Sequence, residues 1–170
     1  YKCAPPIRER ANRDALWGGL RDGTVGMVVT DHSPCTPALK RLDVGAFGEA
    51  WGGIASLQLG LSALWTEAAP RGFSLVDLAR WTAQTPAELA GLTGRKGAIA
   101  VGCDADLVFF DPDATFRVTS SLVRHRHKVT PYEGRVLRGR VRRTLLRGEV
   151  IFDGATVAAP PRGRWLRGRG

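Results

Sequence analysis

A short apolar run at residues 25–29 passes directly into Thr30-Asp31-His32-Ser33-Pro34. Valines favour a strand, and Pro34 ends it because proline cannot donate to a sheet ladder. Asp31 is therefore expected at the carboxyl end of a strand over 25–30, where α/β barrels carry their catalytic groups. A carboxylate there ligates a metal, acts as a general base, or does both. The alternative is an ordinary turn or helix-capping Asp.

The segments around this strand predict an α/β arrangement. A helix is expected from about Asn12, which can cap it, to Leu20, with Asp22-Gly23 ending it. Helix, short turn and strand are the repeating unit of an α/β barrel or a doubly wound sheet. The stretch from Asp31 to Gly53 is too long for a simple connector, which favours a functional loop. Further helices are predicted over 54–69, from Ser74, and from Thr85-Pro86 to Gly91.

The pattern changes at Gly94 to short β segments separated by turns. A change from α/β to β predicts the end of a barrel followed by a β domain. The expected domains are 1–93 (barrel portion), 94–158 (β-sandwich) and 159–170 (a basic, disordered tail). The expected strands are 97–100, 106–111, 115–119 and 135–152, with turns at Asp111-Pro112-Asp113 and Asp153-Gly154.

The formal net charge of +9 raises the question of a nucleic-acid partner. Arginine is concentrated in residues 124–147 and in the tail from Arg162 to Arg169. Such a tail holds phosphate by charge, or it is simply a solvated terminus, which is the better default. A general arginine-rich composition explains it equally well, so nucleic acid is not the expected partner.

Cysteine usage and hydropathy indicate the compartment. Cys3, Cys35 and Cys103 form no CxxC pair, which argues for a reducing cytoplasm. No apolar run approaches the roughly 18 residues that span a bilayer, so no membrane association is expected. The chain begins at Tyr1 without a signal segment, and we expect a fragment of a longer protein.

Other residues were weighed as site candidates. His125-Arg126-His127 resembles an HxH metal pair, since alternate residues of a strand face one side, but its basic neighbours disfavour a cation. Trp51-Gly52-Gly53 exposes backbone to a ligand, or is merely flexible before a helix. His32 is expected to orient the Asp31 carboxylate. Asp104 and Asp106 are expected to shape a turn.

A series of segments between Tyr1 and about Asp153 carries a family pattern. These segments are Lys2-Cys3-Ala4-Pro5-Pro6-Ile7-Arg8, Thr30-Asp31-His32-Ser33-Pro34-Cys35, 50–58, 96–108, 126–132 and 144–148. In this order they resemble the C-terminal part of the cyclic amidohydrolases. The segment with Lys96-Gly97 and Asp104-Ala105-Asp106 is typical of the wider superfamily. Asp31-His32-Ser33-Pro34-Cys35 and Trp51-Gly52-Gly53 resemble the allantoinases within it.

The resemblance implies a fold class and a reaction. The fold is α/β: the C-terminal part of a (β/α)8 TIM-like metal-dependent hydrolase barrel, followed by strands of a small β-sandwich domain. The reaction is hydrolysis of the cyclic amide of allantoin to allantoate in purine degradation. The complete relatives are cytoplasmic, commonly form homotetramers, and carry two Zn²⁺ ions bridged by a carboxylated lysine. By itself this chain lacks that lysine and the HxH ligands, so we expect it alone to be inactive.

The resemblance also assigns roles to residues. Asp31 matches the aspartate that ligates a metal and carries the catalytic proton. Ala4, His32, Gly52 and Gly53 match segments that bind substrate, although Ala4 replaces a frequent serine. Two other functions remain open: another cyclic amidohydrolase, such as a hydantoinase or dihydropyrimidinase, or a non-catalytic remnant that serves as a basic binding module.

Overall fold

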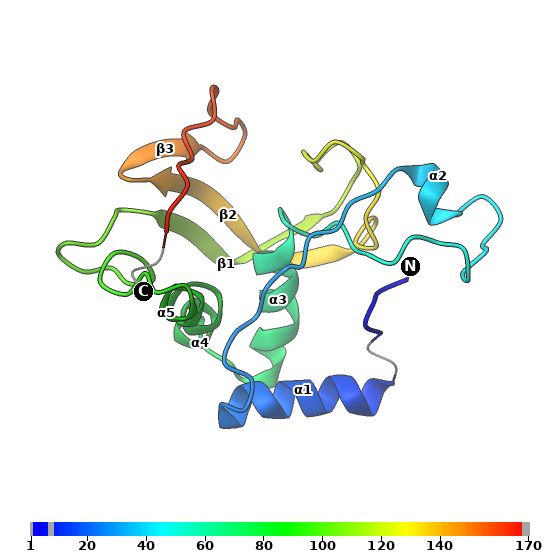
Figure 1. Cartoon of the computed structure of the whole chain (residues 1–170), viewed down its shortest axis with the longest axis horizontal. Helices are drawn as coiled ribbons and strands as arrows, with labels where there is room; N and C mark the ends of the chain where they lie inside the picture. Colours follow the sequence, from blue (N-terminus) through cyan, green and yellow to red (C-terminus); the bar gives the residue numbers. More distant parts are fainter. Residues whose placement is uncertain (1, 7–8, 168–170) are drawn as a thin grey trace. The chain divides into compact units, whose positions relative to one another are not determined.

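The computed structural model describes residues 2–6 and 9–167 of the chain (Figure 1). Ile7 and Arg8 of the family pattern, and the tail residue Arg169, lie outside the described residues. The chain divides into two compact units. The first combines the residues up to Leu61 with Phe116–Leu137, and the second combines Ser62–Thr115 with the residues from Arg138 onward.

The first unit begins with helix α1 (Arg10–Asp22), which confirms the predicted helix. The prediction of Asn12 as its cap was wrong, because the helix starts one turn earlier after Glu9, whose side chain forms no capping hydrogen bond. The helix ends at Gly23, whose φ of 86° lies in the left-handed region that glycine adopts without strain.

Residues 25–30 belong to no strand, so the predicted strand was wrong. A single parallel bridge follows the segment, between His32 and Ile54. An apolar run becomes a strand only when neighbouring strands take up its backbone groups. Among the described residues, no strand pairs with 25–30.

The loop after Asp31 contains a short helix, α2 (Pro37–Lys40), capped by Thr36, whose hydroxyl accepts from the Leu39 N–H. The next helix, α3 (Gly60–Ala68), starts six residues later than predicted, since the prediction began at 54. The prediction was wrong over 54–59 because backbone groups of Ile54 and Ser56 bond to the Asp31 loop instead of to a helix.

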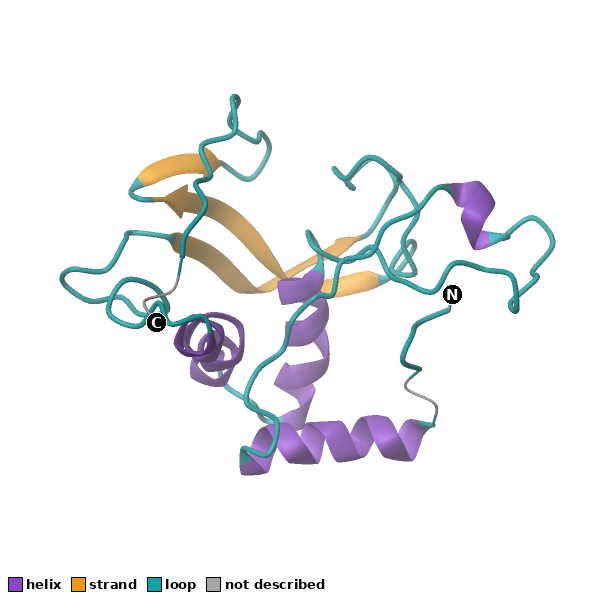
Figure 2. Cartoon of the chain, viewed as in Figure 1, coloured by secondary structure: helices purple, strands orange, loops and turns teal. Residues whose placement is uncertain are grey.

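The second unit holds the remaining helices (Figure 2). A 3₁₀ turn, η1 (Ala69–Arg71), follows α3. Helix α4 (Leu75–Ala79) then begins with the expected Ser74 cap, here a full capping box with Asp77. A π-helical turn, η2 (Arg80–Gln84), leads into α5 (Thr85–Leu89), as Pro86 predicted. The buried side chains of this unit include Trp65, Phe73, Leu78, Trp81 and Ala87.

A three-stranded sheet in the order β1-β2-β3 follows the helices in sequence. Its strands are β1 (Leu107–Arg117), β2 (Val136–Leu146) and β3 (Glu149–Phe152). The predicted strand at 97–100 was wrong, because those residues form a turn and unpaired chain. The predicted turn at Asp111-Pro112-Asp113 instead lies inside β1, although the Asp111 carboxylate still accepts from the N–H groups of Asp113 and Ala114.

The β2–β3 hairpin turns at Arg147-Gly148, where both φ angles are positive, 50° and 83°. This is the backbone of a two-residue hairpin turn whose twist matches its strands. The predicted turn at Asp153-Gly154 is confirmed, since the Asp153 carboxylate accepts from the N–H groups of Ala155 and Thr156. No helix in 2–6 or 9–167 combines the length and apolar character needed to cross a bilayer.

Candidate active site

Asp31 lies in the first unit and has a left-handed backbone and a side chain without a partner among the described residues. Its φ of 41° is left-handed, a conformation that non-glycine residues keep only where the surroundings impose it. The residue is exposed, and its carboxylate forms no hydrogen bond or ion pair with any residue of the described chain. A carboxylate without an internal partner is available to a water, a metal or a substrate.

His32 fixes the segment that carries Asp31. Its Nδ1 atom accepts hydrogen bonds from the backbone N–H groups of Ser56 at 3.0 Å and Leu57 at 3.1 Å. A ring nitrogen that accepts in this way carries no proton, so neutral His32 holds its proton on Nε2. The Ser56 hydroxyl adds a bond to the Thr30 carbonyl at 2.9 Å. This geometry fits the predicted orienting role and occupies Nδ1.

The glycines of the 51–53 segment lie against the residues that follow Asp31. A Cβ atom on Gly53 would lie 2.8 Å from the Ser33 Cβ and 2.9 Å from the Ser33 carbonyl oxygen, so only glycine fits there. The Gly53 N–H donates to the Lys2 carbonyl at 3.0 Å. A Cβ on Gly52 would lie 3.3 Å from the Cβ of Ala4. Of the predicted binding residues, Gly53 therefore lies against Ser33 and Gly52 lies against Ala4.

Lys40 is a site residue that the sequence reasoning missed. Only 5% of it is exposed, and its ammonium group donates to the carbonyls of Trp51, at 3.0 Å, and Gly53. The Trp51 N–H in turn donates to the Leu39 carbonyl at 2.8 Å. No sequence signal marks this residue, because lysine at the end of a short helix is ordinarily exposed.

His125 also lies here, although it is far from Asp31 in the sequence. Its ring centroid lies 5.3 Å from that of His32, with 64° between the ring planes. Burial, and then the electrostatic effect of the neighbouring His32, hold the pKa of His125 below its usual value. Its Nδ1 is buried and finds no partner in the described part of the chain. The same 116–137 segment makes a second contact with the first part of the chain through Thr130, whose hydroxyl donates to the Ala55 carbonyl at 2.7 Å.

The described residues do not complete a metal centre. They contain no group of three His, Cys, Asp or Glu side chains that could hold an ion. His127 joins no such group either. Asp31 has the right chemistry for one ligand, since hard divalent ions and zinc accept carboxylate oxygen. Among residues 2–6 and 9–167, Asp31 is a single candidate ligand without a completing set.

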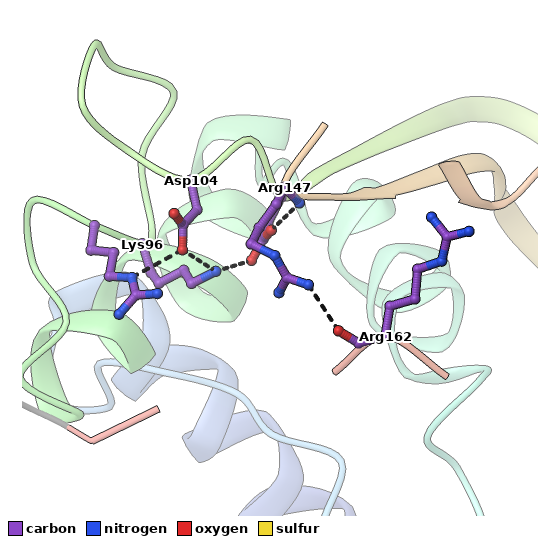
Figure 3. A network of polar contacts seen from close by, with 6 residues as sticks. Lys96, Asp104, Arg147 and Arg162 are labelled. Carbon is purple, nitrogen blue, oxygen red and sulfur yellow. Dashed lines mark hydrogen bonds and ion pairs between the residues drawn. The ribbon is translucent and has the colours of Figure 1, made fainter. Parts of the chain in front are cut away.

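A separate polar network lies in the second unit (Figure 3). The Lys96 ammonium contacts the carboxylates of Asp104, at 2.8 Å, and Asp106, while Arg95 pairs with Asp104 at 3.0 Å. The second oxygen of Asp106 accepts from the Arg147 N–H at 2.8 Å. Asp104 and Asp106 thus tie the loop before β1 to the β2–β3 hairpin, which makes them structural.

This network continues into the basic tail and shifts several pKa values. The Arg147 guanidinium donates to the Arg162 carbonyl at 2.8 Å (Figure 3). The Arg162 side chain in turn pairs with Glu149. Hydrogen bonds from Lys96 and then Arg95 lower the pKa of Asp104. Burial opposes the charge of Lys96, but its two carboxylate partners raise its pKa overall.

Comparisons with known proteins agree with this assembly. A family model described as "Amidohydrolase family" matches residues 5–151. The allantoinase of Streptomyces avermitilis is 52% identical over 98% of this chain and 36% of that protein, and the allantoinase of Saccharomyces cerevisiae is 46% identical over 98% of this chain and 35% of that protein. The chain thus spans about a third of these curated relatives.

Solved structures show the same fold. A D-hydantoinase structure matches 99% of this chain and 37% of its own, with a TM-score of 0.91 and 31% identity. A D-hydantoinase (dihydropyrimidinase) from Thermus sp. matches 93% of this chain and 35% of its own, with a TM-score of 0.83 and 31% identity. The fold is therefore that part of a TIM-barrel metal hydrolase, together with its sheet, and the chain belongs to the amidohydrolase family.

Proposed function

We propose that this chain supplies the Asp31 side of the active site of an enzyme that hydrolyses the cyclic amide of allantoin to allantoate. The observation that carries the proposal is the meeting of three segments: Lys2 and Ala4, Asp31 to Ser33, and residues 51–53. The identity to two allantoinases across nearly the whole chain supports the choice of substrate.

Asp31 carries the proton in this proposal. Its unpartnered carboxylate accepts a proton from the attacking water as the water oxygen bonds to the ring carbonyl carbon. It then delivers that proton to the ring nitrogen as the carbon–nitrogen bond breaks, which leaves a free ureido N–H and a carboxylic acid that becomes the carboxylate by losing its proton to solvent. His32 holds the Asp31 segment in place through the N–H groups of Ser56 and Leu57.

Zinc dependence is part of the proposal. Two Zn²⁺ ions per complete subunit, held by Asp31 and by ligands outside this chain that include a carboxylated lysine, would supply a Lewis acid and an acidified water.

As the family resemblance implies, the complete enzyme is a cytoplasmic homotetramer of purine catabolism. We propose domain limits at 1–93, 94–158 and 159–170. We assign substrate contacts to Ala4, His32, Gly52 and Gly53.

A second cyclic amidohydrolase activity is favoured by one observation, the TM-score of 0.91 to a D-hydantoinase. The test is a chimaera in which this chain replaces the matching region of the Streptomyces avermitilis allantoinase. We expect the chimaera to open allantoin in preference to hydantoin and dihydrouracil. Ring opening of dihydrouracil without allantoin would assign the site to the dihydropyrimidinase reaction instead.

A further inference from the structure

We propose that Lys40 is a positioning residue that holds the 51–53 backbone so that Gly52 presents its own N–H and C=O to the ring amide of the substrate. The part of this inference that concerns substrate rests on the proposed function. The part that concerns the backbone rests on the geometry of Lys40 alone.

Lys40 donates hydrogen bonds to the carbonyls of two residues that lie two positions apart in the chain. Its ammonium donates to the Trp51 carbonyl at 3.0 Å and to the Gly53 carbonyl. Lys40 thus holds every second carbonyl of the 51–53 segment and leaves the Gly52 carbonyl between them unbonded within the described chain.

The neighbouring N–H groups follow the same alternation. Trp51 donates to Leu39, next to Lys40, and Gly53 donates to Lys2. The N–H and C=O of Gly52 bond to no group in 2–6 or 9–167, and the residue is half-buried. The N–H and C=O groups of Trp51 and Gly53 are all bonded. Gly52 is therefore the one residue of the 51–53 segment whose N–H and C=O are both available to a ligand.

This arrangement matches the chemistry of a cyclic amide. Ring closure forces such an amide to be cis, so its N–H and C=O lie along one edge. The N–H and C=O of Gly52, when both face the ring, form the complementary donor and acceptor pair. A buried carbonyl that loses its donor must find another or turn toward water. Removing the ammonium group of Lys40 therefore releases the Trp51 and Gly53 carbonyls and lets the Gly52 edge rotate.

The first test measures amide hydrogen exchange in this chain, without any activity assay. Lys40→Met keeps the length of the side chain and removes its donors. We expect the amides of Trp51 and Gly53 to exchange about tenfold faster, which corresponds to about 1.4 kcal/mol of lost protection. Lys40→Gln, which keeps a neutral donor, should give a smaller increase and covers the case in which the Met variant fails to fold.

Lys128→Met is the matched control. The Lys128 ammonium donates to the Val123 carbonyl in a different loop of the same unit. Exchange in residues 51–53 should be unchanged in this variant. Equal exchange of Trp51 and Gly53 in the Lys40 variants and the wild-type chain would overturn the inference.

The second test uses the chimaera and separates KM from kcat. Lys40→Met should raise KM for allantoin about tenfold with kcat nearly unchanged, since the lost contact serves ground state and transition state alike. Lys40→Arg should recover part of the loss. If the chimaera is active and Lys40→Met leaves its KM for allantoin unchanged, the proposed effect of Lys40 on substrate binding is refuted. An inactive wild-type chimaera with altered exchange would instead overturn the proposed function and leave the backbone role standing.

Discussion

The ring of His125 lies edge-on against the ring of His32, with 5.3 Å between their centroids. His32 is adjacent to Asp31 in sequence, and His125 follows it by more than ninety residues. The contact therefore brings the middle of the 116–137 segment next to the Asp31 loop of the first unit. It also places beside that loop a histidine whose protonation is opposed by burial and by a second histidine.

Asp31→Ala in the chimaera should reduce kcat about 10²- to 10⁴-fold, because the proton carrier is lost. The fold should be retained, since the carboxylate is exposed and holds no partner among the described residues, but alanine at a φ of 41° should lower the free energy of unfolding by about 1 kcal/mol. Steady-state kinetics and thermal melting measure the two effects. Asp43→Ala, at an exposed aspartate in the same loop, is the control and should retain full activity. Near-normal turnover of Asp31→Ala would refute the assignment.

His32→Phe should lower the free energy of unfolding of the chain by about 1–3 kcal/mol. The phenyl ring fills the space but accepts no hydrogen bond, so the N–H groups of Ser56 and Leu57 lose their partner. Urea unfolding followed by circular dichroism measures the change. His32→Asn, whose side-chain oxygen accepts, should lose less. An unchanged midpoint for the Phe variant would show that these bonds contribute nothing.

Stability should fall on mild acidification because of His125. Its pKa is depressed in the folded state by burial and then by His32, so the unfolded chain binds the proton more tightly. The stabilisation is complete above the unfolded value of about 6.5 and is lost as pH falls through the folded value. Unfolding in urea at pH 7.5 and pH 5.5 should show a smaller difference for His125→Phe than for wild type. An equal difference for His125→Phe and wild type would show that His125 does not cause the effect.

A second pH dependence, at lower pH, should arise from the Lys96 network. Bonds from Lys96 lower the pKa of Asp104, and the same lysine lowers that of Asp106 against the effect of burial. Their stabilisation is present above the unfolded value of about 4 and is lost as pH falls through the folded values. Lys96→Met should flatten thermal stability between pH 5 and pH 3.

The control for this prediction is Arg138→Met, which removes an ion pair with the exposed Asp113 on the same sheet. An exposed pair contributes little, so the slope with pH should stay close to that of wild type. A wild-type slope in Lys96→Met would show that the carboxylates titrate independently of Lys96.

Local patterns in the sequence predicted the elements whose stabilising groups are also local. The apolar spacing of α1, the Ser74 cap of α4 and Pro86 at the start of α5 all act within a few residues. The turn at Asp153 depends on bonds to Ala155 and Thr156, and its motif was sufficient to find it. The family pattern likewise named the segments that the first unit gathers.

Features that depend on distant partners were missed. Residues 54–59 have helical apolar spacing, but their backbone bonds to the Asp31 loop, which no local pattern records. Lys40 is buried by residues 51–53, and His125 is placed by its contact with His32. In each case the decisive interaction joins residues at least eleven positions apart, beyond the reach of periodicity and capping rules.

The left-handed backbone at Asp31 narrows the substitutions that this position accepts. Glycine and asparagine adopt a φ near 41° with ease, but neither carries a negative charge. Glutamate keeps the charge, yet its longer side chain lacks the local hydrogen bonding that makes this conformation tolerable and moves the carboxylate outward. The backbone requires a residue that tolerates a positive φ, and the proposed proton transfer requires a carboxylate. Aspartate is the residue that meets both requirements. An engineer redesigning this loop would therefore have to rebuild its backbone before changing its acid.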